Sequence, residues 1–218
     1  MTEQRNHITQ ASLRTPRSAA IAGIIFSALL IALIGMMQLS LPADPADVNV
    51  EWLEEYAAAA SLGLGLLTVA GIAFLWFMGV ARDLLGYLED QFLSTVSLGS
   101  GLLFLAMLFV WAAVGSAMLV SYASDGAALA GSGVYRFGRT LMVQISGVYA
   151  LRMAGVYAFS SATIWFRTGV LPRWLASVTW GVALVLWVFA SFYWWVQLVF
   201  PAWVFLVSIY VLMTSERD

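Results

Sequence analysis

Six long apolar stretches, separated by short polar segments, make up most of the 218-residue chain. An α-helix needs about 20 mainly apolar residues to cross the hydrocarbon core of a bilayer, and most of the stretches reach that length. We therefore predict one all-α domain over residues 19–214, a six-helix transmembrane bundle between polar cytoplasmic tails at 1–18 and 215–218. The predicted spans are residues 19–41, 57–81, 97–121, 140–166, 174–194 and 199–214.

The last two spans are separated only by a short apolar segment that contains Gln197 and Pro201. One kinked helix over 174–214 would be roughly 60 Å long, about twice the thickness of the core. We therefore favour two helices, with Pro201 at the first helical position of the second, where its missing N–H is harmless.

Arginine placement predicts the orientation of the bundle. With the N-terminus in the cytoplasm, seven arginines face the cytoplasm and only Arg136 and Arg139 face outward, as the positive-inside rule requires. Six spans then return the C-terminus to the cytoplasm, so we predict a multi-pass protein of the bacterial cytoplasmic membrane. Tryptophans favour membrane interfaces, and we place Trp165 and Trp174 at the inner one and Trp52, Trp194, Trp195 and Trp203 at the outer one.

Composition excludes several classes of chemistry. The chain is 62% hydrophobic and 10% charged, has no cysteine, and carries its single histidine, His7, in the N-terminal tail. Thiol nucleophiles, disulfides, and metal or haem sites built on cysteine or histidine pairs are therefore excluded. A net charge of −2 without a basic cluster does not suggest nucleic acid. We expect no cofactor, no metal and no enzymatic activity.

Arg152 lies near the middle of the predicted fourth span, and no Asp or Glu lies inside any span. A charge at bilayer depth costs at least ~2.5 to 3.5 kcal/mol, so such a residue is expected to face a functional interior. Glu89 and Asp90 lie about 10 Å outside the core by helical rise, farther than an arginine side chain reaches. We therefore expect another group to neutralise Arg152.

A thin polar sector surrounds this arginine on the helical wheel. Tyr149, Arg152, Ser160 and Thr163 fall within about 80° of one another at 100° per residue, and together form the candidate ligand-binding site. The guanidinium suits bidentate recognition of an anionic headgroup or carboxylate. Alternatively, tyrosine hydroxyls and the carbonyls of a neighbouring helix satisfy a purely structural arginine. Burial against a cavity would favour transport, burial against backbone would favour a scaffold, and contact with lipid along the whole length of the side chain would contradict the assigned topology.

Two further patterns involve helix faces. Trp180, Trp187 and Trp194 recur every seven residues, and the resulting aromatic stripe suits either a flat ligand or contact with lipid and a neighbouring helix. Pairs of small residues four apart predict closely packed helices. These pairs are Ser61 with Gly65, Ser97 with Gly101, and Ala112 with Ser116.

Two loop segments resemble those of uncharacterised six-helix membrane proteins that are frequent in actinobacteria, a domain-of-unknown-function family. The first contains Arg82-Asp83 and Glu89-Asp90, and the second covers residues 167–176, in which Thr168-Gly169 ends one helix and Pro172 with Trp174 begins the next. The resemblance extends from about residue 15 to 214. It implies a six-helix fold and no activity, so no site residue is carried over.

Three functions fit these patterns. The first is a non-catalytic subunit or scaffold, or a lipid-binding membrane protein, whose partners are membrane lipids, other membrane proteins or a second copy of the chain. The second is a small transporter or channel in which Arg152 selects an anionic or amphiphilic solute. The third, a lipid-modifying enzyme, is the weakest because no His, Cys, Lys or paired carboxylate lies within the membrane.

The predicted orientation can be tested with reporters fused after Asp218. We expect a fluorescent protein at this position to mature in the cytoplasm and a periplasmic phosphatase to stay inactive, because six spans return the C-terminus to the inner side. Phosphatase activity outside the cell would contradict the topology.

Overall fold

A computed structural model describes residues 2–40, 50–85, 91–125, 133–190 and 192–214, which contain helices and no strand. The elements are α1 (Thr2–Ser40), α2 (Val50–Leu85), α3 (Gln91–Asp125), α5 (Gly133–Gln144), η3 (Ile145–Ala150), α6 (Leu151–Thr168), α7 (Arg173–Phe189) and α8 (Val196–Thr214). Of these, α5, η3 and α6 follow one another without a break and form one long helical segment, in which η3 is a π-helical turn.

Five of the described helical segments are long and apolar enough to cross a membrane, so the chain is a helical multi-pass membrane protein. They are Arg17–Met36, Ala60–Arg82, Gln91–Ser121, Gly133–Thr168 and Val196–Thr214. The fifth predicted span, 174–194, is shorter than expected: α7 is apolar but ends at Phe189 after 17 residues. At 1.5 Å per residue it is about 25 Å long, less than the roughly 30 Å of a typical core.

The predicted break between the last two spans is confirmed, but not its position. Residues 190–195 connect α7 to α8, and Pro201 lies inside α8 rather than at its first position. The amides of Val196, Gln197 and Leu198 bond to carbonyls three residues earlier, which starts α8 before the proline. Pro201 therefore removes only the hydrogen bond that its own amide would donate to the Gln197 carbonyl.

The turn between α6 and α7 follows its predicted signals. Gly169 has φ 70°, and its amide donates a hydrogen bond of 2.9 Å to the Trp165 carbonyl, so a left-handed residue ends α6. Pro172 is the extended residue before α7, and its carbonyl accepts a hydrogen bond from Leu175. Local backbone chemistry is sufficient to place this turn.

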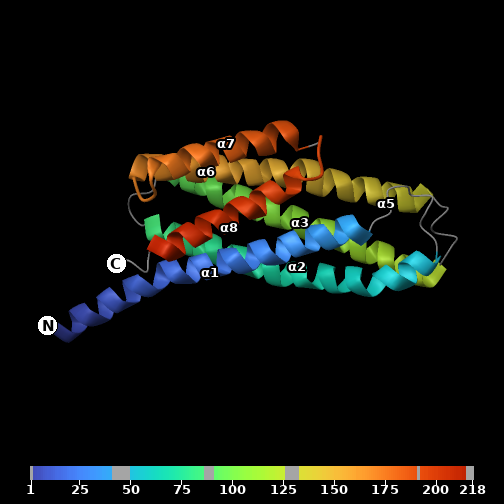
Figure 1. The fold of residues 1–218 in the computed structure, drawn as a ribbon, viewed down its shortest axis with the longest axis horizontal. Helices are drawn as coiled ribbons and strands as arrows, with labels where there is room; N and C mark the ends of the chain where they lie inside the picture. The colour runs from blue at the N-terminus through green and yellow to red at the C-terminus, as the bar shows by residue number, and fades with distance from the viewer. Residues whose placement is uncertain (1, 41–49, 86–90, 126–132, 191, 215–218) are drawn as a thin grey trace.

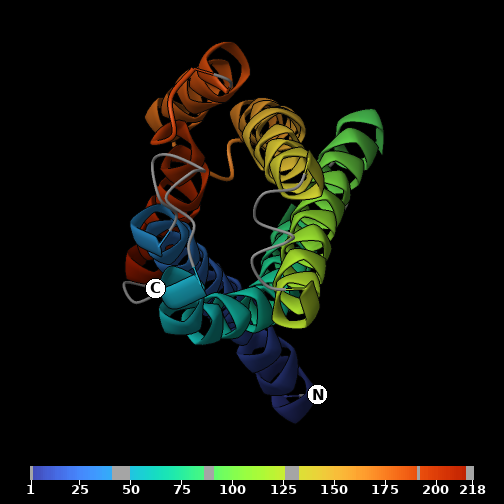
Figure 2. The same ribbon diagram turned by 90° about the vertical axis from the view of Figure 1, so that its right-hand side faces the viewer.

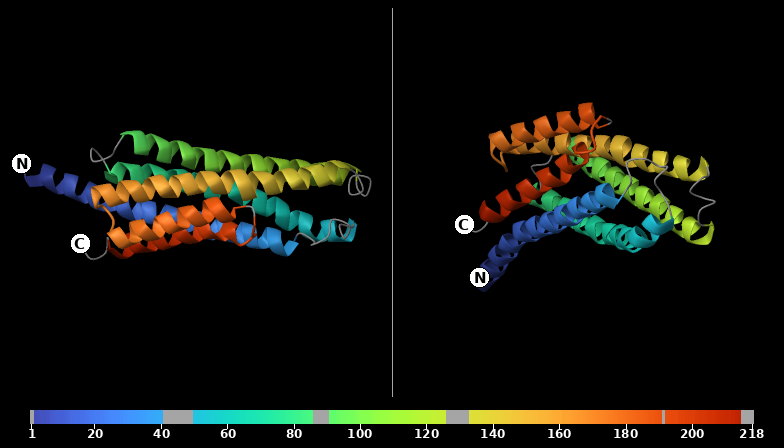
Figure 3. Two further views of the ribbon diagram at one scale, coloured as in Figure 1. Left: turned by 90° about the horizontal axis from the view of Figure 1, so that it is seen from above. Right: turned by 45° about the vertical axis from the view of Figure 1, so that its right-hand side comes forward.

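The helices form a closed ring in the order α1, α2, α3, α6, α7 and α8, with α8 returning to α1. Consecutive segments run antiparallel, so α1 begins and α8 ends at the same end of the bundle, which we call the terminal end (Figure 1). The opposite end is the distal end. There, α2, α3 and α5 continue well beyond the end of α7 and the start of α8 (Figures 1 and 3).

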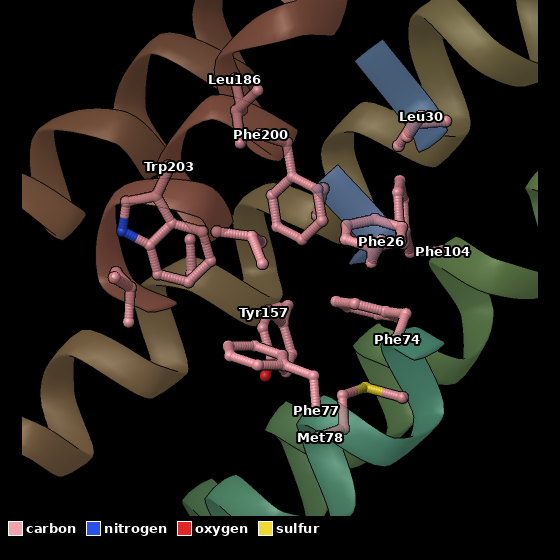
Figure 4. Packing of buried hydrophobic residues seen from close by; sticks show 14 of the residues in the cluster. Phe26, Leu30, Phe74, Phe77, Met78, Phe104, Tyr157, Leu186, Phe200 and Trp203 are labelled. Atoms are coloured by element: carbon pink, nitrogen blue, oxygen red, sulfur yellow. The ribbon is translucent and has the colours of Figure 1, made fainter. Parts of the chain in front are cut away.

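Phenylalanine rings fill the centre of this ring of helices (Figure 4). The ring centroid of Phe74 on α2 lies 4.6 Å from that of Phe26 on α1, and that of Phe104 on α3 lies 4.7 Å from that of Phe200 on α8. Phe74 and Phe104 join the two pairs at 5.5 Å. All four are buried, and Tyr157 of α6 packs against Phe74 and Phe200. We call these four phenylalanines the central phenyl cluster.

Trp203 also belongs to the core, which corrects its predicted place at the outer interface. The side chain is buried, its indole N–H donates a hydrogen bond of 2.9 Å to Thr179 Oγ1, and its ring stacks on Trp165. A tryptophan in an apolar stretch can satisfy its one donor inside the protein, so residue type alone did not reveal its depth.

The pairs of small residues behave in two ways. Gly101 permits close packing of α3 on α6, because a Cβ atom there would lie 3.1 Å from Cδ2 of Tyr157, and Ser97 Oγ lies 3.4 Å from Ser161 Oγ. The other two pairs do not bring helices together. Ser61, Gly65, Ala112 and Ser116 instead line a groove of about 620 Å³ between α2 and α3.

The central phenyl cluster should determine stability. Phe74→Ala should lower the free energy of unfolding in detergent by about 2 to 3 kcal/mol, because it removes ring contacts to four helices and leaves a cavity. Thermal unfolding of the purified protein measures this. Phe137→Ala, at a position 68% exposed, is the matched control and should change stability little. Equal losses in the two variants would contradict the role of the cluster.

Candidate functional site

Arg152 faces away from the bundle. Its side chain is exposed on the outer surface of α6 and makes no hydrogen bond or ion pair with the described residues. Only its backbone carbonyl is engaged, as the acceptor of a hydrogen bond of 3.2 Å from Nε1 of Trp187. The structure therefore does not place Arg152 inside the bundle, where the sequence analysis expected it. Glu89 and Asp90, considered as its partners, lie outside the described residues.

The predicted polar sector does not form one site. Tyr149 is exposed like Arg152, whereas Ser160 is buried and donates its hydroxyl proton to the Val156 carbonyl. Thr163 is half-buried, and its hydroxyl donates to the Phe159 carbonyl. A helical wheel groups positions by angle alone; here Arg152 and Ser160 lie at opposite edges of the sector, and the first is exposed while the second is buried.

The aromatic stripe meets this sector at the contact between α6 and α7. Trp180 donates its indole N–H to Thr163 Oγ1 at 3.3 Å, eleven residues along α6 from the bond between Trp187 and Arg152. Trp194 is not part of a stripe on α7, because that helix ends at Phe189 and Trp194 lies exposed in the following connection. Two of the three tryptophans therefore join α7 to α6.

Gly155 makes room for Trp187 on the surface of α6. A Cβ atom at this glycine would lie 2.6 Å from Cδ1 of the indole and 3.3 Å from the Ala183 carbonyl oxygen. The ring can therefore lie close to the α6 backbone beside Arg152, which brings its N–H to the carbonyl. Arg152, Trp187 and Tyr149 are therefore all exposed in this part of the surface.

The end of α7 indicates the depth of Arg152. Trp187, which contacts it, is two residues from the end of α7, and the connection that follows exposes Tyr193, Trp194 and Trp195. Aromatic residues of this kind favour the membrane interface. With Arg167 taken as the opposite edge of the core, a core of about 30 Å ends near residue 147. Arg152 then lies about 8 Å inside the distal interface rather than at mid-membrane.

A π-helical turn, which the sequence analysis missed, extends the polar surface from Arg152 towards the distal end. Arg136, Thr140 and Gln144 are exposed on α5 at intervals of four, and Tyr149 follows after five residues, across η3. A π turn bonds residues five apart, so it keeps Gln144 and Tyr149 on one face. In the sequence, the spacing between these polar residues changes from four to five at Gln144, and this change could have predicted the π-helical turn.

A second polar group lies between α8 and η3. Ser146 of η3 and Gln197 of α8 line a cavity of about 40 Å³, together with apolar residues of α1, α3 and α6. The Gln197 carboxamide forms no hydrogen bond with the described residues. Ser146 donates its hydroxyl proton to the Met142 carbonyl at 3.0 Å and keeps its lone pairs.

The described residues contain no group of three or more His, Asp or Glu side chains that could hold a metal ion. No protein-family model, no curated protein and no solved structure matches the chain. The resemblance to six-helix proteins of a domain-of-unknown-function family therefore stays a prediction.

Nitroxide labels can test the outward position of Arg152, because the chain has no native cysteine. We expect labels at Tyr149→Cys, Arg152→Cys and Phe159→Cys in vesicles to be mobile and increasingly accessible to oxygen in that order, since depth in the bilayer increases. A label at Ala158→Cys, a buried position, should be immobile. An immobile label at 152, or one most accessible to a water-soluble nickel chelate, would place Arg152 in the interior or in a water-filled cavity.

Proposed function

We propose that this protein is a non-catalytic membrane protein that binds an anionic lipid through Arg152 on the outer surface of α6 and α7. The observation that carries the proposal is the outward guanidinium, level with the end of α7 and without a partner among the described residues. A lipid phosphate is the anion that every bilayer presents near this depth.

The side chain of Arg152 can reach the headgroups. Side chains on an α-helix tilt towards its N-terminus, and the N-terminus of α6 points to the distal interface. An extended arginine side chain spans about 7 Å, comparable with the roughly 8 Å that separate the Cα atom from the edge of the core. Snorkelling therefore places the charge among phosphates while the methylene groups stay in lipid.

Neighbouring residues complete a surface suited to one lipid molecule. Guanidinium binds phosphate oxygens in a bidentate manner, and the exposed amphipathic rings of Tyr149, three residues earlier on the chain, and Trp187, bonded to the Arg152 carbonyl, belong to the same surface. Towards the terminal end, Phe159 and Leu184 are exposed apolar side chains of α6 and α7, along which an acyl chain can pack.

Transport through the bundle receives no support from this geometry. Arg152 lines neither of the two cavities described above, and the central phenyl cluster occupies the middle of the ring of helices. A selectivity charge has to face the path of the solute, whereas Arg152 faces lipid.

Native mass spectrometry of the purified protein can test the proposal. Protein incubated with equal amounts of phosphatidylglycerol and phosphatidylcholine should retain the anionic lipid preferentially. Arg152→Leu should lower retained phosphatidylglycerol about tenfold, the expected effect of losing a charge-assisted bidentate contact of roughly 1.4 kcal/mol.

The matched control is Arg136→Leu, which removes the same charge from an exposed position on the same helical segment. Its retention of phosphatidylglycerol should equal that of the wild type. Equal retention by the wild type and Arg152→Leu would overturn the proposal, as would equal losses in the two variants, since those would show only attraction between net charges.

A further inference from the structure

The cavity between α8 and η3 is lined by Gln197, a half-buried residue whose side chain forms no hydrogen bond with the described residues. Gln197 has two donor hydrogens and a carbonyl oxygen on its carboxamide, and none forms a hydrogen bond with the described residues. Apart from Ser146 and Trp111, the other side chains of the cavity wall are aliphatic or aromatic hydrocarbons, among them Leu30, Leu33, Phe104, Leu108 and Phe200. Gln197 is half-buried and is not among the described residues with a fully buried, unpartnered side-chain polar atom, so water has access to its carboxamide.

Backbone irregularities lie in both walls of the same cavity. Ser146 belongs to the π-helical turn η3, and Pro201, which lies one turn beyond Gln197, replaces an amide that would have bonded to the Gln197 carbonyl. Such departures from regular helices in membrane proteins are tolerated where waters or side chains satisfy the released groups.

The size and chemistry of the cavity are sufficient for at least one water molecule. Its volume of about 40 Å³ exceeds the roughly 10 to 15 Å³ of accessible space that one water needs. A buried water typically makes about three hydrogen bonds, and here the carboxamide oxygen, the carboxamide N–H groups and the lone pairs of Ser146 are available. Gln197 is the second residue of α8, next to the exposed aromatic connection at the distal end, so the cavity lies close to bulk water.

We infer that this cavity is a hydration site, in which a water molecule bridges the Gln197 carboxamide and the Ser146 hydroxyl and so ties α8 to η3. The site closes towards the terminal end, because Phe104 and Phe200 form part of its wall and belong to the central phenyl cluster. The bound water is therefore a structural link at the distal end and does not continue into a conduction path.

Hydroxyl-radical footprinting by X-ray radiolysis tests the site, because radicals formed from a bound water label the side chains around it. Leu33 lines the cavity and Leu186 does not, and both are buried, at 4% and 0% exposure. In the wild-type protein Leu33 should be labelled at least fivefold faster than Leu186. Labelling of Leu33 no faster than Leu186 would overturn the inference without any variant.

Substitutions then assign the water to Gln197. Gln197→Leu should lower the labelling of Leu33 to the level of Leu186, because the main polar partner of the water is lost. Gln144→Leu, at an exposed glutamine on the same face of the bundle as Tyr149, is the matched control and should leave Leu33 unchanged. Unchanged labelling in Gln197→Leu, or an equal loss in both variants, would overturn the inference.

Discussion

The packing of four phenylalanine rings in the centre of the bundle is the contact on which the rest of the structure depends. Lipid chains are as apolar as these side chains, so helices in a bilayer gain nothing from burial alone and associate through close packing. Phe26, Phe74, Phe104 and Phe200 come from four helices. Because hydrocarbon fills this centre, the polar groups of the distal half lie at its margins, with Arg152 on the outside and Gln197 at the edge of the core.

The positions of the helices could be predicted well from the sequence, because the bilayer demands long apolar segments with internally satisfied backbones. The turn between α6 and α7 could be predicted equally well, because Gly169 is of a type that ends helices and Pro172 of a type that precedes them, and the structure agrees at both residues. The end of α7 was not, since the aromatic connection 190–195 is as apolar as the helix before it. Pro201 does not mark the start of α8, because hydrogen bonds between residues three apart begin the helix at Val196, before the proline.

The faces of the helices were much harder to predict than their positions. In water, polarity separates the exposed face of a helix from the buried one; in lipid, both faces are apolar and that contrast disappears. Arg152 and Trp187 could therefore be singled out as unusual residues, but their shared outward position could not be predicted from the sequence. The π-helical turn that aligns Gln144 with Tyr149 changes the helical phase by one residue, which a regular helical wheel cannot represent.

The short α7 has a consequence for the bilayer itself. A helix of 17 residues spans about 25 Å, less than a core of about 30 Å, and thinning of the adjacent lipid by several ångströms is one way in which a bilayer accommodates such a mismatch. This thinning falls on the side of the bundle that α6 shares with α7, where it draws headgroups and water inward. The same lipids that meet Arg152 are therefore the ones that α7 compresses, and a thicker membrane would oppose both.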